Sequence, residues 1–311
     1  MKTTNRIIGI FLMLLPLMSK AQECDLDLMA LVVPQTEELP QEVQTQVLNK
    51  LCVSITGQGV YATENYTQFF VSAQLNTLYK EVLPGPPAKT VVTVSLTLSV
   101  GDFLGQKVFN STVIDLKGVG TGEVRAYVNA LRGLNAKNPK IQQLIAGSKG
   151  KIIDYYDRNY AKLLAKAERC VGTKNFEEAL FYTSSIPECC TGYDEASQAT
   201  VRIYRQYMDY ACRTLLAKAR NAWAVSPDAD GAEEVAYYLN MIDPDAGCYD
   251  EVTALYKEVK EKVKDDWNFE VRKKYEDKVE IAKQTIDAAK AVGVAYGNGQ
   301  KPTTTNLMWL K

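Results

Sequence analysis

The chain has 311 residues, with 36 basic side chains, 37 acidic side chains and no histidine. Its charges are well mixed along the chain, so there is neither a basic stripe for nucleic acid nor a polybasic patch for anionic lipid. The lack of histidine excludes Ser-His-Asp and Cys-His catalysis, histidine general bases and histidine-ligated zinc. No nucleic-acid partner is therefore expected.

The first 21 residues have the pattern of a cleavable signal peptide. Lys2 and Arg6 precede a 12-residue apolar run over 7–18, and Ser19-Lys20-Ala21 places small residues at the positions that a signal peptidase reads. The run is too short to cross a bilayer of roughly 30 Å, which disfavours the alternative of a retained membrane anchor. We expect cleavage after Ala21.

The exported chain would begin at Gln22. Cys24 follows Gln22-Glu23 instead of the small residues that a lipid-attachment site needs, so a lipoprotein is disfavoured. Loss of the basic residues Lys2, Arg6 and Lys20 leaves 33 basic and 37 acidic residues, a net charge of −4. The expected location is the periplasm, the cell surface or the medium, with no membrane span.

Residues 22–150 are predicted to form an α/β module. The apolar run 28–33 predicts a strand, and the apolar spacing over 40–56 predicts an amphipathic helix. Val91–Val100 alternates Val and Leu with Thr and Ser, which is typical of a strand with one buried face. Further strands over 69–82 and 108–116 and a helix over 124–134 complete the order β-α-β-β-β-α. The Thr/Ser face is expected to be solvated or to bind a ligand.

Gly118-Val-Gly-Thr-Gly122 joins the last predicted strand to the last helix of this module. Such a turn can hold a phosphate at a helix N-terminus, but a dinucleotide fold needs it at its first crossover, so a tight turn with close packing is preferred. With this turn and its element order, the module resembles the periplasmic α/β domain of the curli-secretion-channel and penicillin-binding-protein-activator superfamily. Members of that group are commonly lipoproteins, and this sequence departs from them at Cys24.

From residue 151 onward the sequence is helical and repeats itself. Leu163-Leu-Ala-Lys-Ala167 recurs at 215–219, and Tyr193-Asp-Glu195 recurs at 249–251, with offsets of 52 to 56 residues. A period of this length predicts helical hairpins that bury their apolar faces against each other. The Ala-rich helices, with Phe176-Glu-Glu-Ala179 and Ile186-Pro187, are similar to tetratricopeptide-type arrays, which implies a groove for a protein partner.

The predicted fold class is α+β: a small sheet domain followed by an all-α helical-repeat domain. The helical-repeat domain spans 151–292 and ends in one long helix over 250–291, in which apolar residues recur every four positions. Gly293–Gly299 is read as a flexible joint. The tail that follows it over 303–311 is predicted to be a strand.

The seven cysteines contain no C-x-x-C pair, which argues against redox catalysis and a four-cysteine zinc site. An oxidising compartment favours disulfides. We expect a Cys24–Cys52 bond, because the first helix returns the chain toward the start of the first strand. A second bond is expected between Cys248 and either Cys189 or Cys190, because these residues precede the two copies of Tyr-Asp-Glu.

Ser226-Pro-Asp-Ala-Asp-Gly231 partly matches a calcium loop. Asp228, Asp230 and Gly231 fit, but Ser226 stands where the first Asp belongs and Tyr237 stands where the bidentate Glu belongs. A plain turn is preferred. No metal, cofactor or catalytic residue is predicted.

The candidate partner-binding residues are tyrosines of the helical half and the apolar side chains of the tail, since tyrosine favours interface hot spots and exposed apolar groups favour docking. They are Tyr182, Tyr237, Tyr238, Leu307, Met308, Trp309 and Leu310.

The predicted function is non-catalytic envelope assembly or scaffolding through contact with a protein partner or a second copy. The alternative is an exported carboxylate-dependent hydrolase acting on glycan or peptidoglycan, since Asp and Glu suffice for that chemistry. A cleft with two facing carboxylates would favour the hydrolase. An open groove lined by Tyr, Arg and apolar groups would favour the scaffold.

Overall fold

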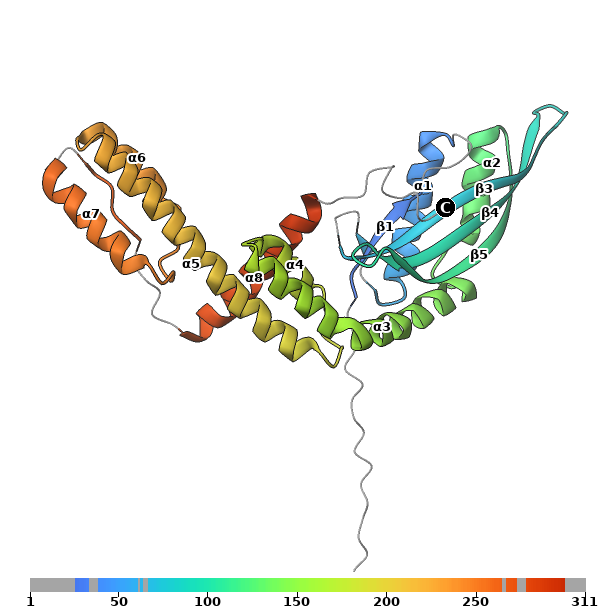
Figure 1. The fold of residues 1–311 in the computed structure, drawn as a ribbon. Helices are drawn as coiled ribbons and strands as arrows, with labels where there is room; N and C mark the ends of the chain where they lie inside the picture. The colour runs from blue at the N-terminus through green and yellow to red at the C-terminus, as the bar shows by residue number, and fades with distance from the viewer. Residues whose placement is uncertain are drawn as a thin grey trace, which may run out of the picture.

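A computed structural model describes residues 26–33, 39–60, 62–63, 67–264, 267–272 and 278–299. It has an α+β fold: a sheet with helices on one face, followed by a helical region (Figure 1). Residues 1–21, Cys24 and residues 303–311 lie outside the described residues. The predictions about cleavage and the tail's strand therefore stay predictions. The predicted Cys24–Cys52 bond is wrong, because the Cys52 side chain is a thiol.

The sheet has five strands in the order β2-β1-β3-β4-β5. β1 is parallel to β2 and to β3, while β3, β4 and β5 form an antiparallel meander. Their bounds are β1 Leu28–Val32, β2 Ala62–Thr63, β3 Phe69–Leu83, β4 Lys89–Asp102 and β5 Lys107–Gly120. The crossover from β1 to its parallel neighbours is helix α1, Gln41–Thr56. The predicted element order is confirmed, with the short β2 in addition.

One face of the sheet builds the main core. In β4 the even-numbered residues from Val92 to Val100 are fully buried, while the Thr and Ser residues between them are half-buried on the opposite face. Helices α1, α2 (Glu123–Ala130) and the first part of α3 (Pro139–Gly172) cover the apolar face. α3 crosses the boundary predicted at 150/151, because Ile141, Leu144 and Ile152 pack into the sheet's core.

The glycines between β5 and α2 allow close packing. A Cβ atom on Gly118 would lie 2.0 Å from the Ala126 carbonyl oxygen, and one on Gly120 would lie 2.5 Å from the Ala126 amide nitrogen. Gly122, with a φ of 127°, makes the turn into α2. The backbone of α2 thus occupies the space beside Gly118 and Gly120, which agrees with the packing interpretation of this motif.

The helical region is built from long and short helices in turn. Long helices α3 and α5 (Tyr193–Val225) are each followed by a short one, α4 (Phe176–Ser184) and α6 (Ala229–Asn240), and α7 spans Tyr249–Val263. Asp228 caps α6, with its Oδ1 accepting hydrogen bonds from the Gly231 amide at 3.1 Å and the Ser226 hydroxyl at 3.0 Å. The segment considered as a calcium loop is therefore a helix-capping turn.

The prediction of one long helix over 250–291 is wrong. α7 ends at Val263, and Lys264 has a positive φ of 54°, which stops the helix. The chain then turns back along α7, where the buried Trp267 ring packs 5.5 Å from the ring of Tyr256. A separate helix, α8, spans Lys278–Gly299.

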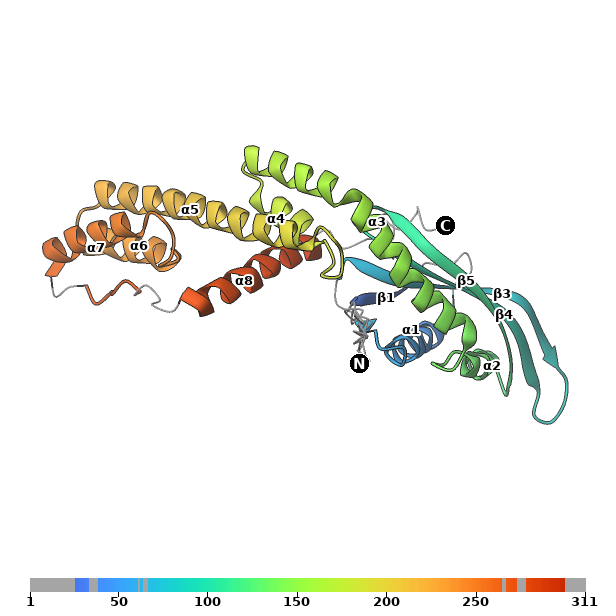
Figure 2. The same cartoon turned by 90° about the horizontal axis from the view of Figure 1, so that it is seen from below.

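The prediction of a glycine joint over 293–299 is also wrong, because these residues belong to α8. α8 lies along α4 in both views (Figures 1 and 2). A Cβ atom on Gly293 would lie 2.7 Å from the Ser184 hydroxyl and 3.3 Å from the Leu180 backbone. The glycine therefore serves close helix packing.

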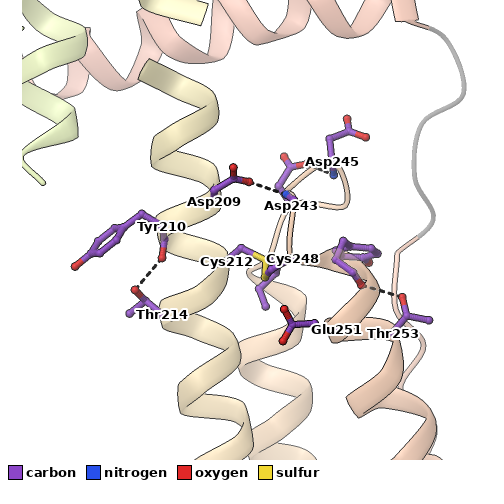
Figure 3. Close-up of a disulfide and its surroundings, with 12 residues drawn as sticks. Asp209, Tyr210, Cys212, Thr214, Asp243, Asp245, Cys248, Glu251 and Thr253 are labelled. Atoms are coloured by element: carbon purple, nitrogen blue, oxygen red, sulfur yellow. Dashed lines mark hydrogen bonds between the residues drawn. A yellow bond between two sulfur atoms is a disulfide. The ribbon is translucent and has the colours of Figure 1, made fainter. Parts of the chain in front are cut away.

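One described disulfide joins α5 to the start of α7 (Figure 3). Cys212 and Cys248 are both buried, and their Cα atoms are 6.2 Å apart. The predicted bond from Cys248 to Cys189 or Cys190 is therefore wrong. Cys189 is itself disulfide-bonded, whereas Cys190 is a buried thiol whose pKa burial raises to about 12.

Candidate functional site

A cleft of about 450 Å³ lies where the sheet meets α4, α5 and α8. The sheet side contributes Leu26 and Asp27 before β1, and Thr67, Gln68 and Phe69 at the start of β3. The helical side contributes the end of α4 with the loop after it, the first residue of α5, and one face of α8. These helical residues are Phe181, Ser184, Ser185, Ile186, Pro187, Glu188, Tyr193, Lys290, Gly293 and Val294.

The walls of the cleft are mainly apolar. Leu26, Phe69, Phe181 and Ile186 belong to the buried core around it, and Val294 is 48% exposed at its α8 side. Ser184 and Ser185 turn their hydroxyls toward carbonyls of their own helix, Leu180 at 2.7 Å and Phe181. The cleft thus combines apolar walls with eight polar or charged side chains, a mixture that suits a ligand with both apolar and polar groups.

Three polar side chains form one cluster at the helical side. The Oε1 of Glu188 accepts hydrogen bonds from Lys290 Nζ at 3.2 Å and from the Tyr193 hydroxyl at 3.1 Å. Burial acts to lower the pKa of Lys290, but its bonds to Glu188 and Tyr193 outweigh burial and raise that pKa. Burial raises the pKa of Tyr193. Lys290 is therefore a cation and Tyr193 a neutral phenol at neutral pH.

A second polar cluster lies behind the sheet side of the cleft. Asp102, fully buried at the end of β4, accepts hydrogen bonds from the Leu104 amide at 2.8 Å, the Gly105 amide at 3.1 Å and the Tyr156 hydroxyl at 2.7 Å. The cleft residue Gln68 donates to the same Tyr156 hydroxyl. This chain of bonds connects the cleft to the junction of β4 and α3.

Burial dominates the electrostatics of this second cluster. It raises the pKa of Asp102 to about 6, although the hydrogen bonds to that carboxylate lower it. Burial and the charge of Asp102 raise the pKa of Tyr156 well above its ordinary value. The Lys107 ammonium lies 4.4 Å from the centroid of the Tyr155 ring, which packs against Tyr156. Asp102 is thus an anion at neutral pH that is held away from water.

The predicted partner-binding tyrosines are not brought together. Tyr182 is half-buried on α4, with its hydroxyl donating to Glu178 at 3.0 Å, and burial raises its pKa to about 12. Tyr237, 63% exposed, and the half-buried Tyr238 lie on α6, at the other end of α5 from α4 (Figures 1 and 2). The remaining candidates, Leu307 to Leu310, lie outside the described residues.

Sequence reasoning missed the residues of the cleft. In the sequence, Ile186-Pro187 is part of the pattern that resembles tetratricopeptide-type arrays, Lys290 lies at the end of the predicted long helix, and Val294 lies in the predicted joint. Within the described ranges, no helix is long and apolar enough to cross a membrane, and no group of three or more Cys, Asp and Glu residues is placed to hold a metal ion.

No protein-family model matches the chain, and no curated protein matches it. Among solved structures, it is similar to a PelC dodecamer variant from Paraburkholderia phytofirmans, with 17% sequence identity and a TM-score of 0.27. The match covers 38% of this chain and 86% of that chain. A likeness this low supports no argument about function.

Proposed function

We propose that this protein acts outside the cytoplasm as a non-catalytic binding protein that holds an apolar segment of a partner protein in the cleft. The observation that carries the proposal is the composition of the cleft: apolar walls from two parts of the chain, and a rim whose charged groups already pair with each other. Such a surface gains free energy by burying apolar area and needs no reactive group.

The polar groups suit recognition more than chemistry. Glu188 already accepts two hydrogen bonds through one oxygen, and Lys290 is held as a cation. A peptide backbone crossing the cleft would meet the side chains of Gln68 and Thr67 on the sheet side. The Thr67 hydroxyl donates to the Phe69 carbonyl at 2.7 Å, so its oxygen is left to accept a hydrogen bond from a main-chain amide, while the apolar walls select side chains.

The export of the chain belongs to this proposal. The signal-peptide pattern and the Cys212–Cys248 disulfide support a location in an oxidising compartment. Envelope assembly or scaffolding is the function that fits such a location and such a cleft.

The carboxylate hydrolase has one observation in its favour, because Asp27 and Glu188 both line the cleft. The two functions differ in what Asp27→Asn does. For a hydrolase this change abolishes turnover of peptidoglycan fragments, which chromatography of the released products measures. For a binding protein no turnover exists in either version, and partner capture persists.

The test of the proposed function uses a photo-crosslinking amino acid at Val294, which faces the cleft, and at Ala295, its exposed neighbour outside the cleft. The expected result in the native envelope is one recurrent partner peptide, rich in apolar residues, that crosslinks to position 294 and not to 295. Equal crosslinking at both positions, or none at 294, would contradict the proposal.

A further inference from the structure

Helix α8 forms one wall of the cleft and also leads to the last part of the given sequence. Lys290 and Val294 line the cleft, and the helix ends at Gly299, about 7.5 Å beyond Val294 at 1.5 Å per residue. The chain after α8 therefore starts about one and a half helical turns from the cleft.

The segment after Pro302 has the reach and the chemistry to fill the cleft. From Gly299 to Leu307 the chain can span up to about 26 Å, more than three times the distance back to Val294 along α8. It contains Leu307, Met308, Trp309 and Leu310 in succession, with Lys311 and no acidic residue after Gly299. The cleft offers apolar side chains from both of its sides, among them Leu26, Phe181 and Val294, which complement the apolar side chains of this segment.

We propose that Thr303–Lys311 of the same chain occupies the cleft and competes there with the partner. The inference rests on the proposed function in one respect only, because that function supplies the partner that the segment excludes from the cleft. Because the segment is tethered to a wall of the cleft, its effective concentration there is in the millimolar range, so a partner must bind tightly or displace it in steps. A second copy of the chain is the other possible source of the segment.

The test compares the full chain with a version that lacks residues 303–311. A fluorescently labelled peptide with the sequence of Thr303–Lys311 is titrated with each protein, and its fluorescence anisotropy is measured. The peptide is expected to bind the truncated chain at least ten-fold more tightly than the full chain, whose cleft is filled. Absent binding to the truncated chain, or equal binding to both, would overturn the proposal.

Two substitutions in the truncated chain locate the binding. Val294→Glu puts a charge on the apolar wall and is expected to weaken peptide binding at least ten-fold. Ala295→Glu adds the same charge to an exposed position on the same helix, so the peptide should bind that variant like its parent. Val294 is 48% exposed, so both variants should keep the parent's circular dichroism and melting temperature. Equal effects of the two changes would overturn the assignment to the cleft.

Light scattering separates the two sources of the segment. A filled cleft within one chain predicts equal oligomeric states for the full and truncated chains. An oligomer that dissociates on truncation would assign the segment to a second copy and overturn the proposal. The failure of this inference can be told apart from the failure of the proposed function. If position 294 crosslinks to a partner but the truncated chain does not bind the peptide, this inference alone is refuted. If the truncated chain binds the peptide but no partner crosslinks, the proposed function alone is refuted.

Discussion

Gly192 lies directly beneath the aromatic ring of Tyr160, so close that a Cβ atom on Gly192 would come within 2.2 Å of the ring's Cγ. With the offsets of 52 and 56 residues seen in the sequence, these two residues correspond to Cys212 and Cys248, which form the disulfide of the next hairpin. The neighbouring hydrogen bonds correspond as well. Asp157 Oδ1 accepts from the Thr191 amide at 2.7 Å, and Asp209 Oδ1 accepts from the Gly247 amide at 2.6 Å (Figure 3).

The Tyr160–Gly192 contact predicts a sharp cost for any side chain at position 192. Gly192→Ala forces a methyl group into the ring and is expected to destabilise the fold by about 1–3 kcal/mol, the usual range for overpacking. Gly150→Ala is the matched control, because a Cβ atom there meets nothing within 4 Å and lies inside α3. Urea denaturation measures both. A Gly192→Ala variant as stable as the Gly150→Ala variant would contradict the prediction.

The correspondence between the two hairpins also predicts that the first one can hold a disulfide at the equivalent positions. The pair Tyr160→Cys with Gly192→Cys places two thiols where the second hairpin has Cys212 and Cys248. In oxidising buffer the double variant should form this bond, seen as a linked peptide by mass spectrometry without reduction. The single variant Tyr160→Cys should keep a free thiol at position 160. Two free thiols in the double variant would show that the hairpins are not equivalent there.

The native disulfide makes its own prediction. Cys212→Ser should lower the free energy of unfolding by roughly 2–4 kcal/mol, because the bond restrains the unfolded chain over 36 residues. Peptide mapping without reduction should recover the Cys212–Cys248 link and should find Cys52 as a thiol. A map in which Cys248 is linked to Cys189 or Cys190 would restore the pairing that the structure contradicts.

Local patterns allowed much of the fold to be predicted. The alternation over Val91–Val100 identifies β4 and its buried face because each residue's burial follows from a period of two along one strand. The apolar spacing over 40–56 identifies α1 for the same kind of reason. Each of these two elements packs one continuous apolar face against the same core. The local sequence is therefore enough to identify both the element and its buried face.

Periodicity failed where chain direction changes. Val263, Trp267 and Val271 are four residues apart and suggest one helical face. Yet the helix ends at Val263, and Trp267 is buried because its own segment folds back and packs on Tyr256 of α7. Buried residues four positions apart occur along one face of a helix, and they also occur where the chain leaves a helix and folds back along it. A single positive φ at Lys264 decides between them, and lysine at that position gives no local sign of it.

The cleft could not be predicted because its walls are far apart in the sequence. Gln68, Phe181 and Lys290 meet only through the packing of α4 and α8 and of the sheet against α3. Gly293 shows the difficulty best. In a sequence it resembles a hinge, but in the structure it lets α8 approach the Leu180 backbone. The disulfide was mispaired because Cys248 corresponds to Gly192, which lies two residues beyond Cys190.

The proposed export predicts the mass of the mature protein. Expressed with its natural start in a Gram-negative host, the protein should lose residues 1–21 and begin at Gln22, which intact-mass measurement of the exported material detects. Ala21→Leu removes the small residue at the cleavage position and should leave the longer chain. Exported material that starts at Met1, or that carries lipid on Cys24, would contradict the proposed export of a soluble chain.

The buried Asp102 predicts an unusual dependence of stability on pH. Its native pKa of about 6 lies above the 3.8 of the exposed carboxyl, chiefly because of burial. Between these values the native state binds more protons than the unfolded state. The contribution of Asp102 is therefore greatest below pH 3.8 and is lost as pH rises through 6, a change of about 3 kcal/mol.

Urea denaturation between pH 4 and pH 7.5 tests this, with Asp102→Asn as the non-titrating comparison. The difference in unfolding free energy between wild type and variant should shift against the wild type by about 2.4 kcal/mol across that range, because part of the full change lies below pH 4. Tyr156→Phe is the second variant and keeps the carboxyl. It removes one hydrogen bond that lowers the pKa of Asp102, so the loss of stability should move to higher pH. Parallel pH profiles for wild type and Asp102→Asn, with no displacement in Tyr156→Phe, would show that Asp102 titrates in the native protein as it does in the unfolded chain.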